Sequence, residues 1–222
     1  MDISNLKPDF TLEAALWNKG YRVVGIDEAG RGTWAGPLFV GAVWLKPQHV
    51  VMLADIKGEI KDSKLLKPAQ RNRIYRHLLD WNVEYSVGEA LPQEVDAHGI
   101  EKAFEMAAAR AFNGLMGQGL LQFPLTADSP MAVLIDGARY RNIPVIPGSI
   151  EIFAEDKLDN ACVSVALASI CAKVHQEANM RGLDFLYPEY GFAKHNGYPT
   201  PVHKLMVDKY GLSHQHRKSW GK

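Results

Sequence analysis

Alternating blocks of apolar and polar residues along the chain predict its secondary structure. Short apolar runs rich in branched side chains predict strands at 21–26, 38–45, 83–90, 131–136 and 149–154. Longer segments with helical spacing or many small apolar residues predict helices at 11–20, 69–81, 99–116, 161–180 and 202–210. Three strands come first and helices alternate with strands afterwards, so the pattern predicts an α/β fold with a sheet of mixed direction.

Composition is that of a soluble globular protein. Of the 222 residues, 47% are hydrophobic and 23% are charged, which suits one domain with one core. No apolar run approaches the roughly 20 residues that span a bilayer, and the first residues lack the pattern of a signal peptide. We therefore expect a cytoplasmic protein with no membrane partner. Cys162 and Cys171 share an apolar segment without a C-x-x-C pair and are expected to be core thiols.

The net charge is zero, but basic residues gather in two stretches. Residues 55–77 contain seven Lys and Arg against three acids, and residues 194–222 contain six against the single acid Asp208. Such stretches suit contact with phosphates, although solvated helix faces produce similar runs. The second stretch also holds four histidines whose spacing fits no usual zinc site, and we expect them at the surface near phosphate. They are His195, His203, His214 and His216.

The segment GIDEAGRGTWAGP, residues 25–37, sets two acids beside a run of glycines. Gly30, Gly32 and Gly36 give the spacing G-x-G-x-x-x-G, which does not fit the dinucleotide-binding fingerprint. Backbone amides without side chains can approach a phosphate or a sugar hydroxyl closely, and Arg31 between two glycines suits that role. The segment by itself is also compatible with a plain turn that carries a solvated arginine.

Acids at the ends of apolar runs indicate a metal site. Asp27 and Asp136 each end such a run, so they reach the same edge of the sheet if their strands are parallel, and Asp156 or Asp159 follows another. Clustered carboxylates repel each other and are stable mainly when they share a hard cation such as Mg²⁺. Four carboxylates would balance two such ions, an arrangement that serves phosphodiester hydrolysis. Glu28 joins Asp27 only if the strand ends or twists there, because successive strand residues face opposite ways.

Five blocks in this order resemble the ribonuclease HII family, also called type 2 ribonuclease H. They are GIDEAGRGTWAGPLFVGAV, DSKLL, LIDG, ASICAKV and YPEYGFAKHNGYPT…HRKSW. The resemblance covers most of the chain and implies a ribonuclease H-like fold, a mixed sheet flanked by helices with a small C-terminal helical region. Residues 1–185 would form the catalytic domain. Residues 186–222 would form a helical, substrate-binding extension of the same domain.

The resemblance implies an endoribonuclease that cleaves the RNA strand of RNA/DNA hybrids and cuts 5′ to single ribonucleotides embedded in duplex DNA. Two-metal-ion hydrolysis with Mg²⁺ or Mn²⁺ would leave a 3′-hydroxyl and a 5′-phosphate. The partner would be nucleic acid, and a monomer is expected. By motif, the catalytic and metal-binding carboxylates fall on Asp27, Glu28, Asp136 and a fourth acid.

The fourth acid is the open point of this assignment. Asp159 lies ten residues before Ser169, which is the family spacing, and is our choice. Asp156 is a second candidate. In the sister family ribonuclease HIII a glutamate serves, which nominates Glu155 and leaves an HIII-like enzyme, or another metal-dependent nuclease of this fold, as the alternative. That family carries an extra N-terminal domain, for which a first block at residue 25 leaves no room.

The resemblance also implies how substrate is bound. The glycine-arginine-glycine turn would read the 2′-hydroxyl of the ribonucleotide, and Tyr198 would pack on the sugar of the following nucleotide. Phosphate contacts are expected from two further blocks. The predicted substrate-binding residues are Gly30, Arg31, Gly32, Ser63, Lys64, Ser169, Lys173 and Tyr198.

The chain departs from the family pattern at two places. Gln176 and Glu177 stand where Arg-Asp is usual, so we expect a salt-bridging role there to be lost or altered. Trp34 replaces the commoner leucine after the glycine-arginine-glycine turn, which predicts different packing beside the site.

Overall fold

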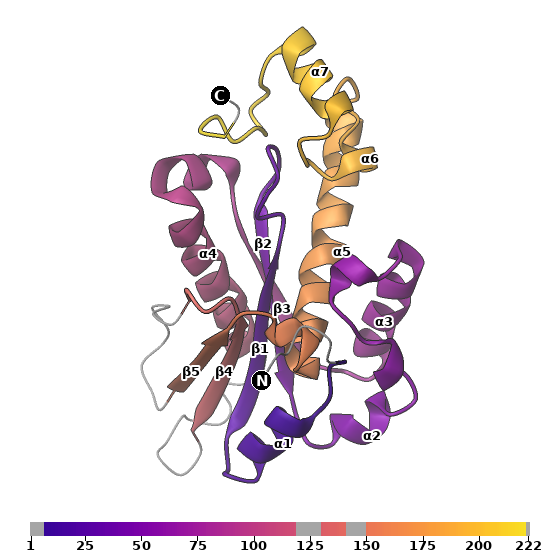
Figure 1. The fold of residues 1–222 in the computed structure, drawn as a ribbon, viewed down its shortest axis with the longest axis vertical. Helices are drawn as coiled ribbons and strands as arrows, with labels where there is room; N and C mark the ends of the chain where they lie inside the picture. The colour runs from indigo at the N-terminus through magenta and orange to yellow at the C-terminus, as the bar shows by residue number, and fades with distance from the viewer. Residues whose placement is uncertain (1–6, 119–129, 141–149, 221–222) are drawn as a thin grey trace.

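A computed structural model of the chain describes residues 7–118, 130–140 and 150–220. Its centre is a five-stranded sheet that lies between two groups of helices (Figure 1). The strands are β1 Arg22–Ala29, β2 Leu38–Leu45, β3 Tyr85–Ala90, β4 Met131–Asp136 and β5 Ile150–Glu155. Their order in the sheet is β3-β2-β1-β4-β5. β2 is antiparallel to β1 and β3, whereas β4 is parallel to β1 and β5, so the predicted mixed direction is confirmed.

Helices cover both faces of the sheet. The helices are α1 Thr11–Trp17, α2 His49–Leu53, α3 Pro68–Asp80, α4 Pro92–Gly117, α5 Val163–Leu186, α6 Phe192–His195 and α7 Pro201–Tyr210, with short 3₁₀ turns η1 Lys57–Glu59, η2 Ser63–Leu65 and η4 Leu158–Asn160. In Figure 1, α4 lies on one side of the sheet and α5 with α3 on the other, while α6 and α7 lie beyond the far end of α5. The predicted domain boundary falls at the last turn of α5 and stays a prediction.

Side-chain alternation along the central strands decides which residues face α5. Val24 and Ile26 of β1 pack in the cluster that contains α4, whereas Val23 packs in a cluster with Val165 of α5. Because strand side chains repeat every two residues, Asp27 falls on the α5 side of β1 and Glu28 on the opposite side. The same alternation in β4 puts Ala132 and Leu134 on the α5 side, and therefore Asp136 as well.

The close contact between β1 and α5 depends on Gly25. A Cβ atom added there would lie 2.3 Å from the backbone carbonyl carbon of Ser164, the second residue of α5. Only glycine therefore lets the helix start approach the strand this closely. The contact brings the segment just before α5 up against the carboxyl end of β1.

Several expectations about buried residues can be compared with the structure. Cys162 and Cys171 are buried free thiols, as predicted. The expectation of surface histidines is wrong for three of the four, because His195, His203 and His216 are buried among the rings of the C-terminal region. In the part of the chain that the structure describes, no helix is both long enough and apolar enough to cross a membrane.

Candidate active site

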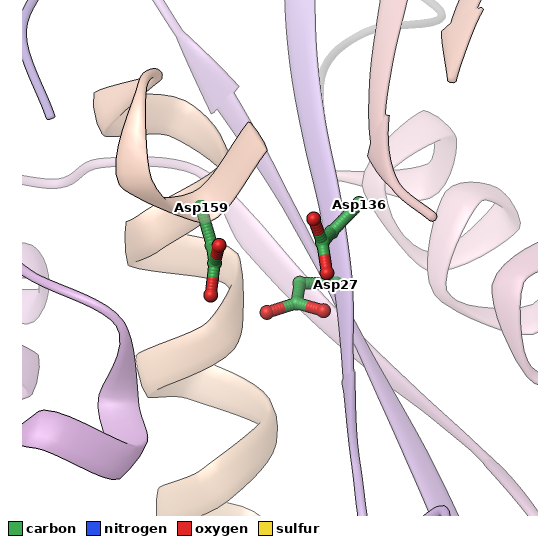
Figure 2. Close-up of side chains that lie close together, drawn as sticks. All are labelled: Asp27, Asp136 and Asp159. Atoms are coloured by element: carbon green, nitrogen blue, oxygen red, sulfur yellow. The ribbon is translucent and has the colours of Figure 1, made fainter. Parts of the chain in front are cut away.

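Three aspartates meet at the carboxyl ends of β1 and β4. One carboxylate oxygen of each lies within 4.8 Å of the others, and Figure 2 shows the three carboxylates turned toward one another. Asp27 and Asp136 follow Ile26 and Ile135, which pair in the parallel ladder, so they emerge side by side. Asp159 comes from η4, immediately before α5. Strands β1 and β4 are parallel, which is the condition under which we expected Asp27 and Asp136 to reach one edge, and the pairing brings these two acids together.

The two other candidates for the fourth acid lie outside this group. Glu155 is exposed and pairs with Asp136 in the β4–β5 ladder. Asp156 is also exposed, and its Oδ1 accepts a hydrogen bond from the amide of Ala138 at 2.9 Å. The geometry therefore favours Asp159, the choice made from its spacing to Ser169.

Burial and mutual repulsion raise the pKa values of these carboxyls. Asp27 is 1% exposed, and burial first, then the charges of Glu28 and Asp136, raise its pKa well above the usual range. For Asp159, burial and then Asp136 raise the pKa to about 7. Burial also raises the pKa of Asp136, against the opposing effect of the Leu158 amide, which donates to its Oδ1 at 2.9 Å.

This donor set fits a divalent cation. All the facing atoms are carboxylate oxygens, the ligands that Mg²⁺ and Mn²⁺ prefer. The Oδ2 atom of Asp27 is buried and has no hydrogen-bond partner among the described residues. A buried oxygen without a partner is costly unless something else binds it. A cation would meet that need and would offset the repulsion among the three acids.

Glu28 occupies a different position from the three aspartates. Strand β1 continues through Ala29, so Glu28 and Asp27 point to opposite sides, which is the difficulty foreseen from the sequence. Its Oε1 lies 3.7 Å from Nη1 of Arg31, and this arginine opposes the rise in the pKa of Glu28 that burial causes. The role of Glu28 as a metal ligand stays a prediction.

Glu28 is one of the residues that line a cavity of about 200 Å³. Its lining contains seven of the eight predicted substrate-binding residues. They are Gly30, Arg31, Gly32, Ser63, Lys64, Lys173 and Tyr198. The eighth, Ser169, is fully buried, and its hydroxyl donates to Oγ of Ser63 at 2.8 Å, so it lies behind the cavity wall.

One wall of the cavity belongs to the loop Gly30–Gly36, which we call the glycine-rich loop. Gly30 has a φ of +88°, a conformation that side chains rarely adopt, and a Cβ there would lie 2.9 Å from Nε2 of Gln176. The Arg31 side chain donates to the hydroxyl of Tyr140 and pairs with Glu101. The arginine is therefore held by the protein, and the backbone of the loop faces the cavity.

Tyr198 also lines the cavity and lies next to Gly32. Its ring comes within 3.8 Å of the position a Cβ would take on Gly32, and Nζ of Lys173 lies 5.4 Å from the ring centre. Lys173 also donates to Oε1 of Gln176 at 2.7 Å. The cavity, which we call the slot, is thus lined by bare backbone and by an aromatic ring, with a lysine beside the ring.

A salt bridge is present at Gln176-Glu177, where we expected such a role to be lost or altered. Glu177 forms a buried ion pair with Arg71, whose Nη1 also donates to the carbonyl of Ser63 at 2.7 Å. The pair therefore supports the loop that carries Ser63 and Lys64. Sequence reasoning missed Arg71 because a buried arginine on a helix cannot be told from an exposed one by its spacing alone.

The other departure, Trp34, packs against α7. Its ring centre lies 6.1 Å from that of His203, and Nζ of Lys204 lies 5.5 Å from the ring.

Arg217, which the sequence placed in the basic tail, is fully buried and contacts the glycine-rich loop. The position of Arg217 within the HRKSW block was the only sequence signal for it.

A mixed sheet with carboxylates at the ends of its parallel central strands defines a metal-dependent nuclease of the ribonuclease H-like class. The chain matches the ribonuclease HII family over residues 24–222. It is 41% identical over 209 residues to a ribonuclease HII of Thermus thermophilus, covering 93% of this chain and 90% of that one. The chain belongs to the ribonuclease HII family, and it is accordingly an endoribonuclease of RNA/DNA hybrids.

Solved structures agree with the fold. The ribonuclease H2 of Pyrococcus horikoshii OT3 superposes with a TM-score of 0.71 at 28% identity, covering 90% of this chain and 93% of that one. A crystal structure of Bst-RNase HIII in complex with Mn²⁺ gives a TM-score of 0.68 at 20% identity, covering 90% and 67%. The second likeness extends to the fold alone. The family match therefore sets the HIII alternative aside.

Proposed function

We propose that this enzyme, besides cleaving RNA/DNA hybrids, cuts 5′ to single ribonucleotides embedded in duplex DNA and leaves 3′-hydroxyl and 5′-phosphate ends. The observation that carries the proposal is the slot lined by the glycine-rich loop and Tyr198, whose lining also includes Glu28, the residue after Asp27. One wall suits a 2′-hydroxyl and the other suits a flat sugar face. A ribonucleotide held there has its phosphate next to the acids.

The acidic residues would bind the cations, and neighbouring groups orient two of them. Divalent cations, Mg²⁺ or Mn²⁺, held by Asp27, Asp136, Asp159 and Glu28 would activate water and stabilise charge on the phosphate. Asp27 offers the buried oxygen that lacks a partner. The Leu158 amide fixes the orientation of Asp136, and the η4 turn fixes Asp159. The protein therefore holds its ligands in place before any cation binds.

Recognition of the ribonucleotide rests on the slot. The amides of the glycine-rich loop can donate to the 2′-hydroxyl, which DNA lacks. The ring of Tyr198 can pack on the next sugar, and a deoxyribose there has no hydroxyl to crowd the ring. Lys64 is exposed at the cavity and Lys173 lies beside the ring, so both can contact the backbone phosphates. The junction is thus read from both sides.

The remaining features concern partners and location. The proposed partner is nucleic acid, and the basic excess of residues 55–77 and 194–222 supports contact with its backbone. We propose that the protein acts as a monomer, because the slot and the acids all come from one chain. We also propose that it acts in the cytoplasm.

A cleavage assay tests the proposal. The substrate is a 5′-labelled DNA duplex with one embedded ribonucleotide, incubated with Mg²⁺ and resolved on a denaturing gel beside size markers for both cleavage positions. We expect a single product that ends 5′ to the ribonucleotide with a 3′-hydroxyl, which a polymerase extends. Asp27→Asn should give no product. Cleavage 3′ to the ribonucleotide, or no cleavage of this duplex by an enzyme that cuts uniform hybrids, would overturn the assignment.

A further inference from the structure

Arg217 lies buried beneath the glycine-rich loop and donates to three of its carbonyl groups. Its Nη1 donates to the carbonyl of Arg31 at 2.9 Å, and its Nη2 donates to those of Gly30 at 2.8 Å and Gly36 at 3.1 Å. Its side chain is fully buried, and burial lowers its pKa to about 10. Burying a cation costs free energy, so its carbonyl bonds are needed to hold it there.

These bonds decide which way the loop amides point. Every described peptide bond is trans, and in a trans peptide the carbonyl and the N–H of the next residue point in opposite directions. The carbonyls of Gly30 and Arg31 point at Arg217, so the N–H groups of Arg31 and Gly32 point away from it. Neither N–H has an acceptor among the described residues. They are two free donors in a loop that lines the cavity.

A pair of histidines connects the same segment to Tyr198. Nδ1 of His203 lies 2.9 Å from the carbonyl oxygen of Tyr198, and Nε2 of His203 lies 3.0 Å from Nε2 of His216. The amide of Ser213 donates to Nδ1 of His216 at 2.9 Å. Burial lowers the pKa of both histidines.

The proton positions in this chain of bonds follow from its two ends. The Tyr198 carbonyl can only accept, so His203 carries its proton on Nδ1, and its Nε2 is an acceptor. The Ser213 amide can only donate, so Nδ1 of His216 is an acceptor and its Nε2 carries the proton. Both rings are neutral, and every bond runs from Ser213 toward Tyr198. A change at His216 therefore reaches the backbone of Tyr198 through one intermediate ring.

We propose that the segment Ser213–Arg217 positions both walls of the slot, with Arg217 as the positioning residue for the glycine-rich loop and His216 as the positioning residue for Tyr198. This inference rests on the proposed function of the slot. Neither residue lines the cavity, so each acts through the group it holds. Two adjacent residues thus position the loop that would bind the 2′-hydroxyl and the ring that would pack on the next sugar.

The first arm of the test changes Arg217. In Arg217→Lys the charge remains, but the compact ammonium lacks the planar fork with which the guanidinium reaches the three carbonyls, so we expect kcat/KM to fall at least tenfold on both the single-ribonucleotide duplex and a uniform hybrid. Arg217→Ala should lose more and regain activity in millimolar guanidinium chloride, but not in the same concentration of sodium chloride. Arg181, exposed on α5, provides the control, and Arg181→Lys should match the wild type.

The second arm changes His216. His216→Asn keeps an acceptor near the Ser213 amide but loses the donor to His203, so we expect it to lower the single-ribonucleotide rate at least fivefold more than the hybrid rate. His216→Gln keeps a donor near the Nε2 position and should restore most of this ratio. His214, exposed in the same segment, is the control, and His214→Gln should leave the ratio unchanged.

Partial unfolding would lower both rates in the same proportion, so the changed substrate ratio in His216→Asn separates positioning from general destabilisation. For Arg217, rescue by guanidinium but not by sodium makes the same separation. The Mg²⁺-dependent rise in Tm shows whether the acidic site is intact in each variant. Wild-type rates in Arg217→Lys, or an unchanged substrate ratio in His216→Asn, would overturn the inference. If the proposed function is wrong, the wild type makes no cut 5′ to the ribonucleotide. The effect of the Arg217 variants can still be measured on the uniform hybrid in that case.

Discussion

Replacing Asp27 with asparagine should abolish cleavage and, in the absence of divalent cations, make the protein more stable. The side chain is buried beside Asp136 and Asp159, and its Oδ2 has no hydrogen-bond partner among the described residues. Asparagine has nearly the same shape and removes the charge. The variant therefore keeps the packing of the site and relieves its repulsion.

The size of the gain follows from the geometry. Two unit charges 4.8 Å apart repel by about 3.5 kcal/mol at an effective dielectric constant of about 20. Asp27 has two such neighbours, but its own raised pKa and a pKa of about 7 for Asp159 mean that protonation removes part of the repulsion near neutral pH. We therefore expect Asp27→Asn to gain about 1–3 kcal/mol. At about 2–4 °C per kcal/mol for a chain of this size, Tm should rise by several degrees.

Thermal unfolding in EDTA and in Mg²⁺, followed by circular dichroism, measures both effects. The wild type should gain stability from Mg²⁺, by about 2.7 kcal/mol at one hundred times the dissociation constant, and Asp27→Asn should gain little. Asp156→Asn is the matched control, because Asp156 is exposed and lies outside the group of three aspartates. The side-chain oxygen of asparagine can still accept the hydrogen bond from the amide of Ala138. A variant less stable than the wild type in EDTA, with its response to Mg²⁺ intact, would refute the reasoning.

Three further outcomes are expected. Asp159→Asn should abolish hybrid cleavage while Glu155→Gln stays within a few-fold of the wild type in kcat, and loss of activity in Glu155→Gln alone would move the ligand to that residue. Tyr198→Ala should cost on the order of 1–3 kcal/mol in kcat/KM on single-ribonucleotide substrates, by analogy with stacking on aromatic rings, and less on uniform hybrids; equal losses would make the ring structural. The pKa of His216 is lowered to about 4, so its contribution to stability is complete above about pH 6.5 and is lost as pH falls toward 4. Urea unfolding at pH 6.5 and pH 5 should therefore show a loss that is smaller by about 1.5 kcal/mol in His216→Gln, and an equal loss would contradict the buried neutral ring.

Much of the sheet could be predicted because its strands carry strong local signals. The run 38–45 and the run 131–136 coincide with β2 and β4, since each is apolar and buried apart from Asp136 at the end of β4. Helix α4 was predicted to begin at 99, but it begins at Pro92, where Glu94 accepts a bond from the amide of Leu91. Pro92 and Glu94 are signals of a helix start that were present in the sequence. The non-helical Gly99 interrupts the helical pattern between them and the rest of α4.

The sequence predicted individual residues of the site but not the tertiary contacts that hold them. Strand ends located Asp27 and Asp136, but the choice of Asp159 over Asp156 depends on how η4 turns, which no periodicity records. The partners of Arg217 lie more than 180 positions earlier in the chain, and the His203–His216 pair is formed by tertiary packing. Contacts of this kind leave no local pattern, so composition assigned these residues to a solvated basic tail.

The parallel pairing of β1 with β4 has a consequence for the kinetics of folding. It joins Asp27 to Asp136, 109 positions later (136 − 27), and closing a loop of that length costs roughly 4 kcal/mol of chain entropy before any contact rewards it. The carboxylates therefore meet only after the intervening chain has found its place, and a cation has no assembled site to bind until then. Mg²⁺ should accordingly prolong the lifetime of the native state by slowing unfolding, while the rate of folding stays the same.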